Sequence, residues 1–167
     1  MKPIFNNVPN KSYKTTCGKT IWDSRSVATC ATILRPKPED NSILQVLAVR
    51  RGEKVSHTDR WSLCCGFLDR AETAIEGVRR EIYEESGILL NFDELEFDYF
   101  NDRPDKDELQ NITFHYMAYL ARDVDFDLTN VDKGEVTEAR WFDINEKEID
   151  SVEWAFGHGT KLKNMIY

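Results

Sequence analysis

Three glutamates in the middle of the sequence have the spacing of a metal site. Glu81, Glu84 and Glu85 would share one stripe of a helix, because successive residues are about 100° apart around a helix axis. Three like charges on one stripe repel one another unless a multivalent cation neutralises them. Clustered oxygen ligands favour Mg²⁺ or Mn²⁺. The alternative is a solvated acidic face, which charge runs on helices usually form.

The residues around the cluster predict a helix with defined ends. Thr73 followed by Glu76 predicts a capping box at the helix start. Gly87 predicts the end of the helix, since glycine favours the left-handed conformation found just after many helices. Apolar residues at helical spacing predict the core-facing stripe. They are Ile75, Val78 and Ile82.

Small residues and an arginine accompany the glutamates. Ala74 and Gly77 fall on the glutamate stripe, where a solvated face has no need of small side chains but a face approached by a ligand does. Arg80 lies beside Glu84, and a forked hydrogen bond from its guanidinium would fix the rotamer of a carboxylate. These neighbours favour the metal site over the solvated face.

Residues 66–88 read GFLDRAETAIEGVRREIYEESGI and resemble the signature of Nudix hydrolases. That signature is Gly-x5-Glu-x7-Arg-Glu-U-x-Glu-Glu-x-Gly-U, where U is a bulky aliphatic residue. Every fixed position is filled. The residues are Gly66, Glu72, Arg80, Glu81, Ile82, Glu84, Glu85, Gly87 and Ile88.

The resemblance implies a pyrophosphohydrolase that uses Mg²⁺ or Mn²⁺. Its reaction would be hydrolysis of the diphosphate bond in a nucleoside diphosphate linked to another group, such as ADP-ribose or a nucleotide sugar. Dinucleoside polyphosphates, nucleoside triphosphates and RNA 5′ ends are alternative substrates. A non-catalytic nucleotide sensor is a more remote alternative, because such modules typically lose box residues that this chain keeps.

The resemblance also assigns roles to residues. It implies that Glu81, Glu84 and Glu85 bind metal, that Glu81 or Glu84 receives the proton of the attacking water, and that Arg80 and Glu72 orient these ligands. A backbone carbonyl at Gly66 or Cys65 would be a further ligand. A late acidic ligand is expected shortly before Trp141; Glu135 is favoured over Glu138 by its spacing.

Candidate substrate-binding residues are cations and aromatic side chains near the box. Cations suited to phosphate are Arg50, Arg51 and Arg70, and aromatic residues suited to stacking on a base are Trp61 and Phe67. The alternatives are surface cations and core aromatic residues, which are more common for each type.

The chain departs from the family pattern just before the box. Many relatives have Trp-x-Leu-Pro-Gly-Gly where residues 61–66 read WSLCCG, and glycine before Glu72 is replaced by Ala71. Cysteine tolerates a positive φ less well than glycine, so an altered loop is expected. The adjacent Cys64 and Cys65 could be redox-sensitive, although inert packing is the favoured interpretation.

Composition limits the class of protein. The 167 residues, with 41% hydrophobic and 31% charged residues, suit one globular domain. The net charge of −8 makes long nucleic acid an unlikely ligand and leaves a small nucleotide as the expected partner. The absence of a signal segment, of a membrane-spanning run and of zinc-type cysteine spacing predicts a cytoplasmic protein with no membrane partner. The family resemblance adds a possible homodimer.

The order of the expected elements predicts an α+β fold. We expect an irregular arm at 1–20 and a single domain at 21–167. Expected strands cover residues 25–35, 43–50, 61–63, 94–101, 111–121 and 139–143, and expected helices cover 73–86, 145–149 and the end of the chain from 154. The family resemblance sharpens this expectation to an α/β/α sandwich with a mixed sheet between helices, in which the signature forms a loop, helix and loop.

Overall fold

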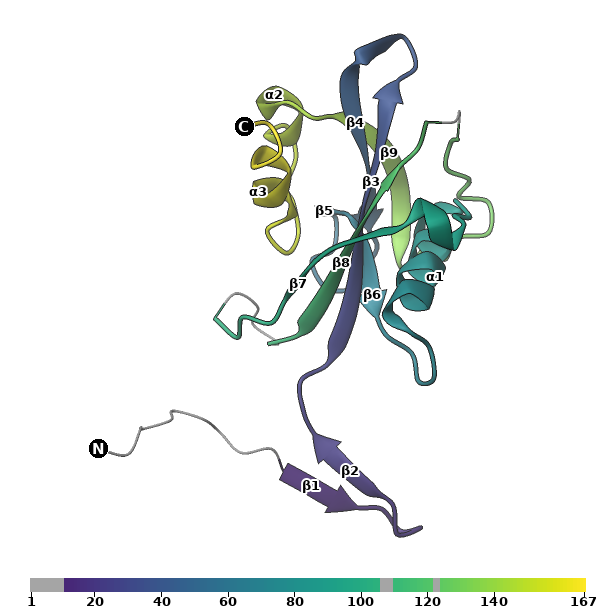
Figure 1. Cartoon of the computed structure of the whole chain (residues 1–167), viewed down its shortest axis with the longest axis vertical. Helices are drawn as coiled ribbons and strands as arrows, with labels where there is room; N and C mark the ends of the chain where they lie inside the picture. Colours follow the sequence, from purple (N-terminus) through teal and green to yellow (C-terminus); the bar gives the residue numbers. More distant parts are fainter. Residues whose placement is uncertain (1–10, 106–109, 122–123) are drawn as a thin grey trace, which may run out of the picture.

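The structure, a computed structural model, describes residues 11–105, 110–121 and 124–167 (Figure 1). Residues 1–10 of the expected arm lie outside the described residues, as do 106–109 and 122–123 in two of the expected loops.

A mixed sheet forms the middle layer of the fold. Within the described ranges its strand order is β5-β4-β3-β8-β7, with β6 paired to β3 and β9 paired to β4. The pair β3–β8 is parallel and the other pairs are antiparallel. The strands are β3 (Val27–Lys37), β4 (Asp40–Arg51), β5 (Trp61–Ser62), β6 (Cys64–Phe67), β7 (Glu96–Asn101), β8 (Ile112–Tyr119) and β9 (Val136–Asp143).

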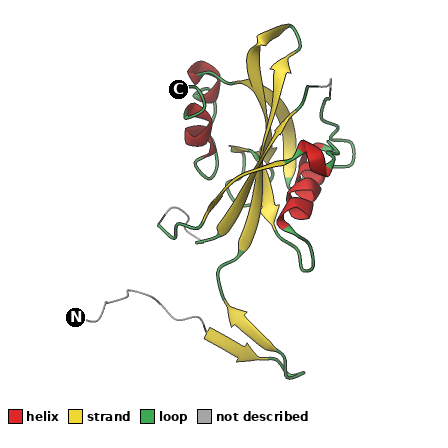
Figure 2. Cartoon of the chain, viewed as in Figure 1, coloured by secondary structure: helices red, strands yellow, loops and turns green. Residues whose placement is uncertain are grey.

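Helices cover both faces of this sheet (Figures 1 and 2). Helix α1 (Ala74–Ser86) lies on one face, and the short helices α2 (Glu146–Ile149) and α3 (His158–Lys163) lie on the other. A 3₁₀ turn at Phe92–Glu94 precedes β7. The α/β/α sandwich with a mixed sheet is therefore confirmed.

The two faces of β3 each bury their own apolar cluster. Ala31 and Ile33 belong to the cluster under α1, and Cys30 and Leu34 belong to the cluster under α2 and α3. Successive side chains of a strand point to opposite faces, so a strand buried on both sides reads as a continuous apolar run. For this reason, residues 25–35 are predicted to be a strand from their β-branched and apolar composition, and not from an alternation of polar and apolar residues.

The N-terminal arm differs from the expectation. Lys11–Lys14 (β1) and Thr20–Asp23 (β2) pair as a separate antiparallel two-stranded sheet before β3 (Figure 1), so residues 11–14 are a strand and not an irregular segment. Trp22 on this hairpin is 62% exposed.

Three other boundaries differ from the expectation. Strand β9 begins at Val136 and not at 139, and the unexpected strand β6 pairs with β3. Helix α3 begins at His158 and not near 154, because Phe156 and Gly157 have φ values of 54° and 73° and cannot continue a right-handed helix. None of the helices in the described ranges has the length and apolar character of a membrane-crossing segment.

Candidate active site

Helix α1 begins and ends as its sequence predicts. The Thr73 side chain accepts a hydrogen bond from the Glu76 amide, and the Glu76 carboxylate accepts one from the Thr73 amide, which makes the capping box. Gly87 has a φ of 73° and its amide donates to the Tyr83 carbonyl. These caps fix which carboxylates face the loop before the helix and which face the loop after it.

The apolar stripe of α1 holds the helix on the sheet. Val78 and Ile82 are fully buried, and Ile75 packs at the edge of the same cluster. Gly77 is small for a different reason from the expected one. A Cβ there would lie 2.4 Å from Leu68 Cδ2 and 3.0 Å from Glu72 Oε1, so the chain's own loop, and not a ligand, occupies the space beside it.

Arg80 connects the carboxylates of the box. Its Nε and Nη2 atoms donate to the two oxygens of Glu72 at 3.1 and 2.6 Å, a forked pair. Its Nη1 atom donates to Glu81 at 2.7 Å and to Glu84 at 2.9 Å, and Nη2 also reaches the Phe67 carbonyl. The forked bond expected with Glu84 is thus made with Glu72, which lies on the loop and can face the guanidinium squarely.

Glu81 lies directly over the backbone of Gly66. A Cβ on Gly66 would come within 2.2 Å of Glu81 Oε1, so any other residue here would displace this carboxylate from its present position. The approach also puts the Gly66 backbone beside a predicted ligand, as the family resemblance requires of a carbonyl ligand.

Glu85 is the most buried of the three predicted ligands. It is 8% exposed, and its Oε2 atom accepts a hydrogen bond from the Cys65 amide at 2.9 Å. Glu84 is the most open, with 52% of its side chain exposed. Of the three carboxylates on the helix, Glu85 and Glu81 are therefore shielded from solvent and Glu84 is open to it.

The pKa values of these groups follow from their surroundings. The forked hydrogen bond from Arg80 lowers the pKa of Glu72 and raises that of Arg80. Burial raises the pKa of Glu81, although Arg80 opposes the shift. Burial, with Cys65 and Glu81 close by, raises the pKa of Glu85 well above its ordinary value.

The donor set fits a hard divalent cation. Glu81 and Glu85 are desolvated carboxylates. Arg80 offsets the effect of burial at Glu81 only in part, and a cation would stabilise both groups in their ionised form. In the described residues no three acidic, His or Cys side chains converge in metal-ligand geometry. Glu72, Glu81 and Glu84 share Arg80 instead. Arg80 donates to only one oxygen each of Glu81 and Glu84, so a cation would bind these two carboxylates through their other oxygens.

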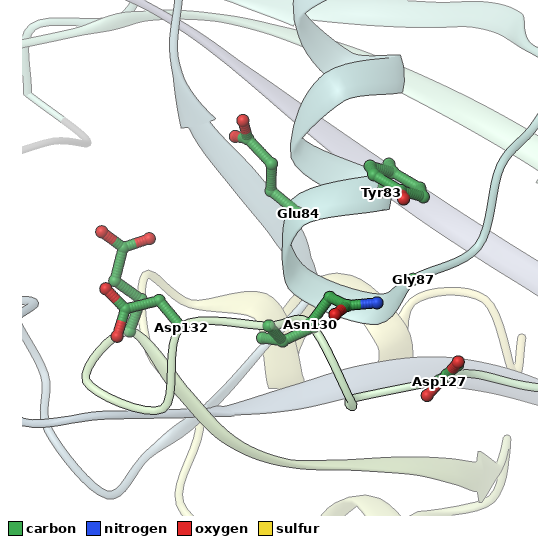
Figure 3. A pocket seen from close by; sticks show the side chains of 8 residues that line it. Tyr83, Glu84, Gly87, Asp127, Asn130 and Asp132 are labelled. Atoms are coloured by element: carbon green, nitrogen blue, oxygen red, sulfur yellow. The ribbon is translucent and has the colours of Figure 1, made fainter.

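A pocket of about 390 Å³ lies at the end of α1 (Figure 3). Glu84 comes from the last turns of the helix, and Asp132 comes from the loop that faces it. Glu135 lines the same pocket as Glu84, which supports its choice as the late acidic residue. Glu138 lies opposite Arg50 in the β4–β9 register and pairs with it at 3.7 Å.

Sequence reasoning missed other residues of this pocket. Asp127, Asn130 and Asp132 line it together with Tyr83. Asp132 also pairs with Lys54 at 2.8 Å. The acidic composition of the loop was the available signal, but nothing in the sequence indicates which loop residues turn towards the helix.

The predicted substrate-binding residues do not form one group. Phe67 is 53% exposed and Arg70 is exposed, and both precede α1; the Phe67 carbonyl accepts a hydrogen bond from Arg80. Arg50 and Trp61 line a second pocket, of about 320 Å³, that shares no lining residue with the pocket at Glu84. Arg51 is buried, and its guanidinium lies over the Phe156 ring.

Trp61 is largely a core residue. It is 7% exposed, and its ring meets Phe142 edge to face at 4.9 Å. His158 is also structural, since its Nδ1 atom accepts a hydrogen bond from the Leu63 amide at 3.1 Å. Both placements agree with the more common role of buried rings.

A family model described as the NUDIX domain matches residues 24–158. The chain therefore belongs to the NUDIX family. A comparison with curated proteins finds no significant match.

Solved structures of the family have the same fold. A MutT/nudix family protein from Enterococcus faecalis is 25% identical, with a TM-score of 0.63, over 72% of this chain and 44% of that one. The NUDIX domain of Shewanella oneidensis NrtR, complexed with ADP ribose, is 17% identical, with a TM-score of 0.69, over 84% and 86%.

A third structure is a bifunctional NMN adenylyltransferase/ADP ribose pyrophosphatase from Francisella tularensis, complexed with AMP and a Mn ion. It is 18% identical, with a TM-score of 0.67, over 86% of this chain and 41% of that one. The chain thus spans less than half of the Enterococcus and Francisella proteins.

Proposed function

We propose that the chain hydrolyses the diphosphate bond of a nucleoside diphosphate linked to another group, with ADP-ribose and nucleotide sugars as the substrate class. The observation that carries the proposal is that Glu84 of the complete box and Glu135 of the facing loop line one pocket. Two similar proteins agree with this class of substrate: the Shewanella NUDIX domain is complexed with ADP ribose, and the Francisella protein is a bifunctional NMN adenylyltransferase/ADP ribose pyrophosphatase.

The charge of the pocket supports a metal-dependent reaction. Its acidic lining residues are Glu84, Asp127, Asp132 and Glu135. An anionic diphosphate would be repelled by such a wall unless cations lay between them. Glu81, Glu84 and Glu85 would hold Mg²⁺ or Mn²⁺, with the Gly66 carbonyl and Glu135 as further ligands. When bound, such an ion supplies charge neutralisation and a bound water of lowered pKa.

The protein's own groups have distinct tasks in this proposal. Arg80 holds Glu72, Glu81 and Glu84 in fixed positions through its hydrogen bonds. Glu81 or Glu84 receives the proton of the attacking water. Phe67 and Arg70 lie exposed before α1, where a base and a phosphate would be accessible to them. The pairing of Arg50 with Glu138 and the burial of Arg51 make these two arginines weaker candidates.

Product analysis by chromatography with mass detection tests the proposal. Wild type and Glu84→Gln are incubated with Mg²⁺ and ADP-ribose, nucleotide sugars, diadenosine polyphosphates, nucleoside triphosphates and a triphosphorylated RNA. Cleavage of ADP-ribose or a nucleotide sugar at the diphosphate, by wild type only, is the expected result. Cleavage of another member instead would replace the substrate class.

A failure to cleave any substrate would point to the sensor alternative. In that case, tight binding of a nucleotide without turnover, measured by calorimetry, would overturn the enzymatic proposal. Glu138→Gln serves as a matched control for Glu84→Gln, since it removes a carboxylate outside the pocket and should keep turnover.

A further inference from the structure

Cys65 has a structural partner that is not its neighbour in sequence. Strand β6 runs antiparallel to β3, and Cys65 and Cys30 are direct partners in this register. Both side chains point to the face covered by α2 and α3, whereas Cys64 points to the opposite face. The fold thus separates the adjacent cysteines and creates the pair Cys30–Cys65.

The backbone geometry of this pair permits a disulfide. Residues directly opposite each other in an antiparallel pair have Cα atoms about 4.5–5.5 Å apart, within the range of about 4.4–6.8 Å found in disulfides. Contact with the Cys30 thiol, together with burial, raises the pKa of the Cys65 thiol, so oxidation of the pair begins from the small thiolate fraction of Cys65. A disulfide between these strands therefore needs a small adjustment and no refolding.

His158 orders this pair of thiols. Its Nδ1 atom accepts a hydrogen bond from the Leu63 amide at 3.1 Å, so the proton of the neutral ring must be on Nε2. The Nε2 atom lies 3.7 Å from Cys30 Sγ and donates to it. Cys30 Sγ therefore accepts a hydrogen bond from the His158 ring, and Cys30 is also the direct cross-strand partner of Cys65.

We propose that Cys30 and Cys65 are a redox modification site, joined as a reversible disulfide by hydrogen peroxide. Cys65 is partly exposed and reacts first: its sulfur attacks one peroxide oxygen, the O–O bond breaks, and a sulfenic acid and water form. The sulfur of Cys30, which is 1% exposed, then attacks the sulfenic sulfur, and a second water leaves. Two thiols lose two protons and two electrons, and the peroxide gains both.

Oxidation of this pair would reach the box through the backbone. The Cys65 amide holds Glu85 at 2.9 Å, and the next residue, Gly66, is the one over which Glu81 lies. Drawing Cys65 towards Cys30 shifts the supports of both carboxylates. A displacement of about 1 Å at such supports costs up to 100-fold in rate, so we expect the disulfide to lower turnover at least 10-fold.

Mass spectrometry tests the site without any assumption about the substrate. The exposed Cys17 is first replaced by Ser, so that the remaining thiols are Cys30, Cys64 and Cys65. The folded protein is treated with hydrogen peroxide, then denatured and alkylated. The expected product is about 2 Da lighter before alkylation, takes up one alkyl group instead of three, and carries a 30–65 linkage in its peptide map. Dithiothreitol should restore three alkylations.

Two variants decide between a specific pair and general oxidation. Cys30→Ala should abolish the disulfide and keep the reduced protein's turnover, whereas Cys64→Ala should leave the disulfide intact, because Cys64 faces the other core cluster. Cys30→Ser is the substitute if Cys30→Ala fails to fold. Absence of the linkage, or the same loss of thiols in Cys30→Ala, would overturn the site. If the disulfide forms but turnover is unchanged, the proposed effect of the disulfide on Glu81 and Glu85 is wrong.

Discussion

Arg80 donates two hydrogen bonds to Glu72, from Nε at 3.1 Å and from Nη2 at 2.6 Å, one to each carboxylate oxygen. This fork joins the loop before α1 to the middle of the helix. The third nitrogen, Nη1, is thereby aimed at Glu81 and Glu84. The position of two predicted metal ligands thus depends on a planar guanidinium, which is held by a carboxylate that is not among the predicted ligands.

Replacing Arg80 by Lys should lower kcat by about 10–100-fold, as expected for loss of a group that orients metal ligands. Lysine keeps the charge but cannot make the fork, so Glu81 and Glu84 lose their shared anchor. Steady-state kinetics should show little change in KM. Arg79→Lys is the control, since Arg79 donates to the Leu90 carbonyl and contacts no box carboxylate. Equal losses in both variants would contradict a positioning role for Arg80.

Glu135→Gln should raise the Mg²⁺ concentration that gives half-maximal activity by about 10-fold, because Glu135 lines the pocket with Glu84. Glu138→Gln should leave this concentration unchanged, because Glu138, on β9, pairs with Arg50 of β4 and does not line the pocket. A metal titration of turnover in the two variants measures the difference. The reverse order would move the late acidic ligand to Glu138.

The parts of this fold that the sequence predicted are those with local signals. The capping box joins Thr73 to a residue three positions away, and Gly87 ends the helix through its own backbone angle. The β3–β4 hairpin needs only two apolar runs and a turn. In each case the interacting groups are close together in the sequence, so a local sequence pattern is enough to predict the contact.

The parts that could not be predicted depend on strand register. Whether Glu135 or Glu138 enters the pocket is decided by where β9 begins and by its pairing with β4. The partner of Cys65 is likewise set by the pairing of β6 with β3. A shift of one residue would reverse each face, and no local pattern specifies such a register. The family resemblance implied a mixed sheet but did not say which strands pair in parallel; the structure shows that they are β3 and β8.

Ala71→Gly should stabilise the protein by about 1 kcal/mol. Ala71 has a φ of 72°, in the left-handed region that costs an L-residue energy and costs glycine almost none. Relatives of the family commonly have glycine at this position, immediately before the box glutamate. Denaturant unfolding of the variant measures the change in the free energy of unfolding. The control Ala74→Gly, at the first helical residue of α1, should destabilise the protein instead. Destabilisation by Ala71→Gly would show that the loop relies on the alanine side chain.

His158 should make the protein less stable as the pH falls below 6.5. Burial, followed by the charges of Lys161 and Arg51, lowers the pKa of His158 from 6.5 to about 3. The unfolded chain therefore binds a proton between these values that the folded chain does not, and folding stability is lost as the pH falls through this window. The cause is structural: Nδ1 already accepts the Leu63 amide, so protonating it would set two donors against each other.

His158→Asn isolates this contribution, because an amide oxygen can accept the Leu63 hydrogen bond but cannot titrate. Between pH 7.5 and 5.5 the free energy of unfolding of wild type should fall by about 1.4 kcal/mol more than that of the variant. The comparison cancels the opposing contribution of Glu85, whose raised pKa favours the folded state as the pH falls. Denaturant unfolding at both pH values provides the four free energies required. Parallel changes in the two proteins would mean that the folded state accommodates a charged ring, and that the Leu63 amide does not hold Nδ1 as its acceptor.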